Sequence, residues 1–268
     1  MIKVVSKDDL SLDETYQDYI NRVARQTLPE SHETQLKSIQ SSPKFVAGKP
    51  AKFPGYTIST PLGKEDPANG EFYHHLTELQ QEIQENLGPD LLIMLPPATF
   101  HLTLADLIWE NSYRHAIEED PNFEAELRKE IKTTFEKYRQ TISVIKPITW
   151  QLLGLVIRPR AIVACLVPKD RESYEAIIQL RRCVYQNRTL IGLGIEQQYD
   201  YTAHVTLGYF GQIENEGISD RLLKIISKIN TRLVEIKPQL LTINQFQLHK
   251  FDTMIDYYRE PDWAIVKF

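Results

Sequence analysis

The stretches FHLTL at residues 100–104 and AHVTL at residues 203–207 repeat one pattern, a histidine and a threonine separated by a single apolar residue and followed by leucine. Both stretches lie in apolar segments that we expect to form β-strands. Residues i and i+2 of a strand share a face, so each stretch presents an imidazole and a hydroxyl side by side. The four residues that form these pairs are His101 with Thr103, and His204 with Thr206.

The segments around the two motifs follow a similar order of elements. Each half of the chain offers strands, an amphipathic helix and then a strand that carries the motif. This is an α+β pattern with an internal duplication, and we expect two lobes packed as one unit. The expected helices span 13–26, 71–87, 122–138, 170–187 and 219–233, and the expected strands span 53–60, 91–95, 100–108, 148–157, 161–167, 199–210, 241–248 and 263–268.

The domain organisation follows from composition. Residues 1–50 are polar and charged, and we interpret them as a helical and loop extension. Residues 51–268 form the expected core domain, with lobes of roughly 51–145 and 146–268 whose strands can interleave.

Charge and hydropathy restrict the partners. The formal net charge is -5, whereas proteins that bind along duplex nucleic acid usually carry an excess of basic residues. We therefore expect no extended duplex as a partner. A small nucleotide or a single RNA end needs only a few local cations. The N-terminal sequence has no apolar signal core, and no run approaches about 18 apolar residues, so we expect a cytoplasmic protein without a membrane span. We expect it to act as a monomer.

Two opposed imidazoles are the groups that cleavage of a phosphodiester by acid–base catalysis requires. If a pseudo-twofold axis relates the lobes, the two motif faces oppose each other across a groove. One neutral histidine then takes a proton from the nucleophile, and one protonated histidine gives a proton to the leaving oxygen. The hydroxyls can hold the phosphoryl oxygens as charge develops on them.

The motifs, with FPGYT at residues 53–57 and LPPATFHLT at residues 95–103, resemble the 2H phosphoesterase superfamily. This superfamily includes the RNA ligase/2′,3′-cyclic phosphodiesterases, and the resemblance, over roughly residues 53–268, is strongest to a poorly characterised bacterial and fungal branch. It implies a bilobal fold in which two antiparallel sheets line a central groove with helices outside. It also implies cleavage of cyclic or linear phosphodiesters without metal or other cofactor. His101 and His204 match the catalytic positions, and Thr103 and Thr206 match the phosphate ligands.

Two departures leave the substrate open. Asp106 follows the first motif, and Gly208-Tyr209 follows the second, where some members have a basic residue. We expect hydrolysis of a 2′,3′-cyclic phosphate on a nucleotide or an RNA end, as in RNA processing. Other cyclic nucleotides and a cyclic phosphate of an ADP-ribose-like compound are alternatives. A nucleotide sensor that binds in the groove without turnover, and a metallohydrolase, are rivals of other classes.

Several further residues remain candidates. Strict alternation turns Tyr209 away from the catalytic face, unless a bulge at Gly208 re-aims it. Exposed arginines in turns are usually solvated, although the pair around Pro159 can reach a phosphate. The adjacent pair on the helix of residues 71–87 does not have the spacing of metal ligands. These candidates are Tyr209, Arg158, Arg160, Tyr56 and Thr57, the pair is His74 and His75, and Asp252, Asp256 and Arg259 are expected in a surface loop.

Overall fold

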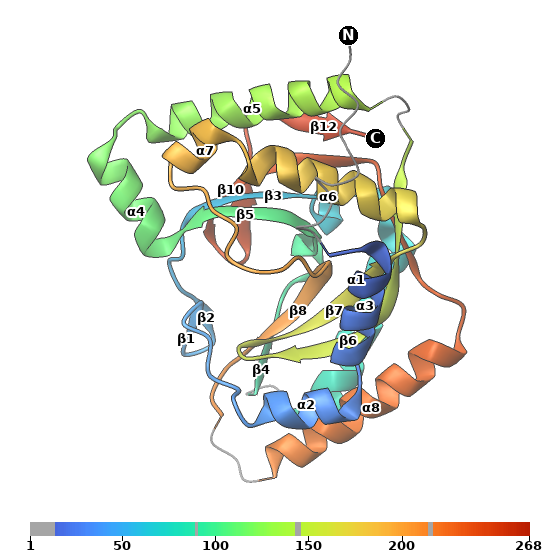
Figure 1. The fold of residues 1–268 in the computed structure, drawn as a ribbon. Coiled ribbons are helices and arrows are strands. Elements are labelled where there is room, and N and C mark those ends of the chain that lie inside the picture. The colour runs from blue at the N-terminus through green and yellow to red at the C-terminus, as the bar shows by residue number, and fades with distance from the viewer. Residues whose placement is uncertain (1–13, 89–90, 143–145, 214–216) are drawn as a thin grey trace.

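The computed structural model describes residues 14–88, 91–142, 146–213 and 217–268 of the chain. Within these ranges, two five-stranded antiparallel sheets form the centre of the molecule, and helices cover their outer faces (Figure 1). One continuous cluster of buried apolar residues includes side chains from both sheets. The predicted α+β fold with two antiparallel sheets is therefore confirmed.

The first sheet is built around strand β3 (Gly55–Ser59), in which every residue is buried. Its strand order is β11-β10-β3-β5, and β12 also pairs with β10. The edge strand β5 begins at Thr103 of the first motif, and His101 lies two residues before it. The other strands are β5 (Thr103–Trp109), β10 (Gln245–Thr253), β11 (Asp256–Tyr258) and β12 (Ile265–Lys267).

The second sheet has the order β4-β8-β7-β6-β9. The long strands β6 and β7 pair directly through a tight turn at Pro159, as their two apolar runs predict. Strand β7 is buried along its whole length, and β8 pairs with it and carries His204. The strands are β4 (Leu92–Met94), β6 (Ile148–Arg158), β7 (Ala161–Pro168), β8 (His204–Phe210) and β9 (Leu240–Ile243).

Each sheet contains strands from both halves of the core. Strand β4 precedes the first motif but pairs with β8 in the second sheet, whereas β10 to β12 complete the first sheet from the C-terminal end. The sheets thus interleave. The lobe boundary near residue 145 lies outside the described residues, and the division into 51–145 and 146–268 stays a prediction.

The helices lie on the outer faces (Figure 1). Helices α4 and α5 contact strands of the first sheet, α1, α2 and α8 contact the second, and α6 contacts both. Asp170 caps α6 by accepting a hydrogen bond from the Ser173 backbone N–H, as predicted. No described helix is long and apolar enough to cross a membrane. The helices are α1 (Tyr16–Gln26), α2 (Pro29–Leu36), α3 (Gly70–Leu87), α4 (Glu110–Glu119), α5 (Phe123–Thr141), α6 (Arg171–Tyr185), α7 (Arg188–Gly192) and α8 (Ile218–Glu235), with 3₁₀ turns η2 (Gly63–Glu65), η3 (Pro67–Asn69) and η4 (Pro97–Thr99).

The N-terminal segment packs on the core. Tyr19 and Val23 of α1 are fully buried, and the helix contacts β7. A small ribbon of β1 (Phe45–Val46) and β2 (Lys49–Pro50) follows before β3 begins. Residues 1–13 of the predicted extension lie outside the described part of the chain, and the boundary at residue 50 stays a prediction.

Both motif strands begin later than predicted, and the prediction that His101 lies on a strand is wrong. After the turn η4, the Leu102 N–H donates to the Thr60 hydroxyl at 3.0 Å, and the Leu102 carbonyl accepts from the Thr60 N–H at 2.9 Å. Regular pairing starts at Thr103, opposite Ser59. In the second motif, β8 starts at His204.

Candidate active site

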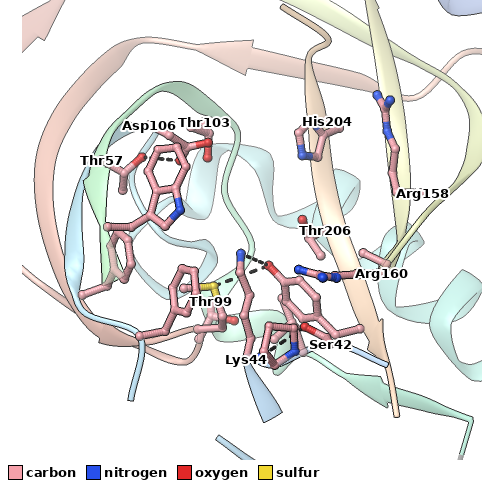
Figure 2. Close-up of a pocket in the computed structure, with 18 of the residues that line it drawn as sticks. Ser42, Lys44, Thr57, Thr99, Thr103, Asp106, Arg158, Arg160, His204 and Thr206 are labelled. Carbon is pink, nitrogen blue, oxygen red and sulfur yellow. Dashed lines mark hydrogen bonds between the residues drawn. The ribbon is translucent and has the colours of Figure 1, made fainter. Parts of the chain in front are cut away.

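A groove of about 670 Å³ lies between the two sheets. Its volume falls within the range of about 300–1,000 Å³ that is usual for small-molecule sites. Asp106 and Thr103 lie on one side of it, with His204 and Thr206 on the other (Figure 2). The structure thus brings together all four residues singled out by the sequence, His101, Thr103, His204 and Thr206.

A bulge follows the first motif in β5. Thr103 pairs with Ser59 and Ala105 pairs with Ile58, so Leu104 between them has no partner in β3. The extra residue shifts the alternation of the strand by one. Asp106, three positions after Thr103, therefore lines the groove as well.

The second motif has a bulge at the corresponding position in β8. Thr206 pairs with Val163 and Gly208 pairs with Ile162, which leaves Leu207 without a partner in β7. Tyr209 lines the groove as a result, so the preference for core packing that strict alternation gives is wrong and the bulge alternative is right. Gly208 is required because a Cβ there would meet the Ile93 carbonyl oxygen at 2.9 Å.

Buried polar side chains from two helices donate to carbonyl groups at the two bulges, where the Leu207 carbonyl oxygen also accepts from the Leu95 N–H at 2.9 Å. Arg181 of α6 donates through Nη1 to the Leu104 carbonyl oxygen. Gln80 of α3 donates through Nε2 to the Leu207 carbonyl oxygen at 2.7 Å and to that of Leu95 at 2.9 Å. Since buried carbonyls need partners, these contacts stabilise the bulges that aim Asp106 and Tyr209.

The two histidines are held in the same way. His101 Nδ1 lies 2.8 Å from the Thr99 carbonyl oxygen, and His204 Nδ1 lies 2.7 Å from that of Thr202. A carbonyl oxygen only accepts, so Nδ1 carries hydrogen and donates in both rings. Each Nε2 is therefore the nitrogen that can exchange a proton with a bound molecule.

Helix α1 holds the segment that orients His204. The Tyr19 hydroxyl donates to the Leu166 carbonyl at 3.0 Å and accepts from the Ala203 N–H at 2.9 Å. Arg22 donates to the Thr202 hydroxyl at 2.8 Å and to the Tyr201 carbonyl at 2.6 Å. The N-terminal segment therefore supports one of the two imidazoles.

Burial lowers the pKa of both imidazoles. The pKa of His204 is lowered to about 4, mainly by desolvation and also by the nearby charges of Arg158 and His101, while the hydrogen bond to Thr202 and the carboxylate of Asp106 oppose the shift. Desolvation also lowers the pKa of His101. Lys44 adds to that shift, whereas the hydrogen bond to Thr99 and the Asp106 charge act against it. An empty groove at neutral pH thus favours neutral imidazoles.

Asp106 has polar partners on its own side of the groove. The Tyr199 hydroxyl donates to Oδ2, and the Thr57 hydroxyl lies 3.4 Å from Oδ1. Of the two candidates on β3, Thr57 lines the groove and Tyr56 is buried in the core, where its hydroxyl accepts from Arg128 at 3.1 Å.

Other candidates have structural partners. His74 and His75 each lie within 3.5 Å of Glu78, and neither lines the groove between the sheets. The described residues include no group of three or more His, Cys, Asp or Glu residues that could hold a metal ion. The predicted surface loop at Asp252, Asp256 and Arg259 is wrong in part, because Asp256 begins β11 and Asp252 lies within β10.

Several residues that line the groove were not predicted from the sequence. Lys44 comes from the segment interpreted as an extension, and Tyr257 from β11 contacts the His101 ring at 4.9 Å between centroids. Neither belongs to a motif, so only the tertiary arrangement reveals them. Arg158 and Arg160, left open by the sequence, both line the groove.

The comparisons with known families bear on this geometry. Residues 44–123 match a family model named 2H-phosphodiest and described as a domain of unknown function (DUF1868). Over these residues, the resemblance to the 2H phosphoesterase superfamily is confirmed. The match includes His101, Thr103 and Asp106, and it supports phosphodiesterase activity in general terms. No curated protein matches the chain.

One solved structure shares the fold at low identity, and others match the chain with lower TM-scores. The conserved protein of unknown function ATU0111 from Agrobacterium tumefaciens has a TM-score of 0.58 and 14% identity, over 82% of this chain and 92% of its own. TT0787 of Thermus thermophilus has a TM-score of 0.42 and 15% identity, over 80% and 94%. Escherichia coli LigT in complex with 3′-AMP has a TM-score of 0.39 and 12% identity, over 81% and 96%.

Proposed function

We propose that this protein is a metal-independent phosphodiesterase that hydrolyses a cyclic phosphodiester, foremost the 2′,3′-cyclic phosphate of a nucleotide or an RNA end. The observation that carries the proposal is the pair of imidazoles in one groove, each with Nδ1 bound to a backbone carbonyl and Nε2 left for proton transfer. A cytoplasmic monomer with a role in RNA processing is the setting we expect.

His204 is assigned as the general base and His101 as the general acid. The base must be neutral in the free enzyme, and His204 is the imidazole whose pKa falls to about 4. In the reaction, Nε2 of His204 takes a proton from water as the water oxygen attacks phosphorus. Nε2–H of His101 protonates the ribose oxygen as its bond to phosphorus breaks. The product is a phosphomonoester.

The remaining groups bind the phosphate. Thr103 and Thr206 supply hydroxyls next to the two imidazoles, and hydroxyl donors stabilise negative charge that develops on phosphoryl oxygens. Arg158, which lies beside His204 in Figure 2, adds a permanent positive charge on that side. The bound anion also favours protonation of a neighbouring imidazole, which supplies the proton the acid needs.

The test is turnover by the purified protein in excess EDTA, measured with cyclic nucleotides and with RNA that ends in a 2′,3′-cyclic phosphate. We expect a phosphomonoester product, no loss of rate in chelator and no product from the double variant His101→Ala/His204→Ala. A rate lost in EDTA and restored by one divalent ion would show a metallohydrolase instead. Tight binding without product would show the nucleotide sensor.

A further inference from the structure

The groove is positively charged although the chain carries a formal net charge of -5. Its permanent charges are three cations and one carboxylate. A phosphodiester has one negative charge, and the cation beside His204 is placed to balance it. Two further cations remain at one end of the groove. The cations are Lys44, Arg158 and Arg160, and the carboxylate is Asp106.

Lys44 and Arg160 have only neutral polar partners among the described residues. Lys44 Nζ donates to the Tyr209 hydroxyl at 3.3 Å, and Arg160 Nη2 donates to Gln40 Oε1 at 3.3 Å. No described carboxylate lies within 4.0 Å of either cation. Figure 2 shows both at the end of the groove where Ser42 lies, away from Asp106. Their charges are therefore available to a ligand.

The segment that carries Lys44 is fixed to the second sheet. The Gln40 N–H donates to the Pro159 carbonyl at 2.7 Å, and the Ser42 N–H donates to the Phe210 carbonyl at 2.8 Å. The Phe210 N–H in turn donates to the Arg160 carbonyl at 3.0 Å. These bonds bring the two cations to the same wall, so a ligand need not order that segment on binding.

Two aromatic rings position the Lys44 side chain itself. Nζ lies 4.9 Å from the centroid of Phe53 and 5.0 Å from that of Tyr209. Such contacts favour a fixed ammonium over a freely moving one. Tyr209 has this place because of the β8 bulge. Lys44 and His101 line the same groove, so this cation and the reacting groups face one cavity.

We propose that Lys44 and Arg160 form a second anion subsite, which binds a phosphate of the substrate other than the one that is cleaved. This inference rests on the proposed function and adds the substrate class. The second phosphate can be the 5′-phosphate of a cyclic mononucleotide or the adjoining phosphodiester of an RNA end. Both present the same anionic oxygens to an ammonium and a guanidinium.

The experiment compares kcat/KM for three substrates. They are adenosine 2′,3′-cyclic phosphate, the same compound with a 5′-phosphate, and a dinucleotide that ends in a 2′,3′-cyclic phosphate. We expect about a tenfold higher kcat/KM where a second phosphate is present, the scale of one charge-assisted hydrogen bond. A gain with the 5′-phosphate alone would identify a free nucleotide as the source, and a gain with the dinucleotide alone would identify an RNA end.

The variants Lys44→Met and Arg160→Gln test the residues. Methionine keeps an unbranched chain to pack on the Phe53 and Tyr209 rings. Each variant should lose more activity on the two substrates with a second phosphate than on adenosine 2′,3′-cyclic phosphate, so the gain shrinks toward one. The matched control is Lys49→Met, which removes an exposed cation of the same segment that does not line the groove and should keep the full gain.

A measurement on the wild-type protein tests the subsite even if the variants do not fold. The kcat/KM of the wild-type protein should fall more steeply with added salt for the two substrates with a second phosphate. Equal kcat/KM for all three substrates, or an unchanged gain in both variants, would overturn the subsite while the phosphodiesterase stands. No product from any of the three would reject the proposed function and the subsite with it.

Discussion

At the scale of single residues, the site depends on which ring nitrogen carries the proton. The carbonyl oxygens of Thr99 and Thr202 each accept a hydrogen bond from Nδ1 of the histidine two positions further along the chain. The same kind of local contact therefore fixes the tautomer of each imidazole. The sequence predicts that each imidazole shares a face with a threonine hydroxyl. It does not reveal the tautomer, since that depends on the direction of a carbonyl group.

The division of labour between the histidines can be tested with the leaving group. A nitrophenyl phosphodiester has a good leaving group and needs little help from an acid. His101→Ala should then lose far less activity on this substrate than on a ribose ester, for which general acid catalysis is worth about 10²–10⁴-fold. His204→Ala should lose activity on both. Rates of the two variants on both substrates provide the measurement, and the opposite pattern would exchange the roles.

The lowered pKa values of the imidazoles predict the pH dependence. The active free enzyme has one proton on the pair, so kcat/KM peaks between two macroscopic pKa values. Burial lowers both from the usual value of about 6.5, and the maximum of kcat/KM should therefore lie below pH 6.5. A bound phosphodiester anion favours protonation, so the maximum of kcat should lie at higher pH. A kcat/KM maximum above pH 7.5 would contradict this prediction.

At the scale of elements, the two bulges decide which side chains beyond each motif face the groove. The period of two in the apolar residues predicts the strands, but a bulge adds one unpaired residue and reverses the alternation after it. Neither LAD at residues 104–106 nor LGY at residues 207–209 signals that change, apart from the glycine. The structure places Asp106 and Tyr209 at equivalent positions, three residues after each threonine, and this equivalence is not evident without the register.

Gln80 provides a test of how the second bulge is stabilised. Gln80→Leu removes the buried donor to the Leu95 carbonyl and one of the two donors to the Leu207 carbonyl, which keeps the Leu95 N–H. An unsatisfied buried group costs about 1–3 kcal/mol. We expect the free energy of unfolding in urea to fall by that amount. The neighbouring Gln81 is exposed, so Gln81→Leu should change it by no more than about 0.5 kcal/mol. Equal effects of the two substitutions would show that the amide of Gln80 does not stabilise the bulge.

At the scale of the whole molecule, the sequence predicts the bilobal α+β fold but not the path of the chain through it. Similar elements recur in both halves, which suggests lobes in chain order. The short strand β4 nevertheless pairs in the second sheet, and the C-terminal strands pair in the first. The polar composition of the N-terminal segment likewise conceals its role, because Tyr19 and Lys44 support the groove through hydrogen bonds to the second sheet that composition does not reveal.

The interleaved sheets predict one cooperative unfolding transition. β3 pairs on one side with β10, and β8 pairs on one side with β4, so neither sheet keeps its hydrogen bonds if the other half of the chain unfolds. Two variants, each with a single tryptophan left in the chain, report on the two sheets separately through tryptophan fluorescence. Trp150 lies in β6 of the second sheet, and Trp109 ends β5 of the first. Their fluorescence should follow the same urea curve, with the same midpoint and slope, since coincident probes are the mark of two-state unfolding. The far-ultraviolet circular dichroism of each variant serves as its control. Separate midpoints for the two tryptophans would mean that the lobes unfold independently in spite of the exchanged strands.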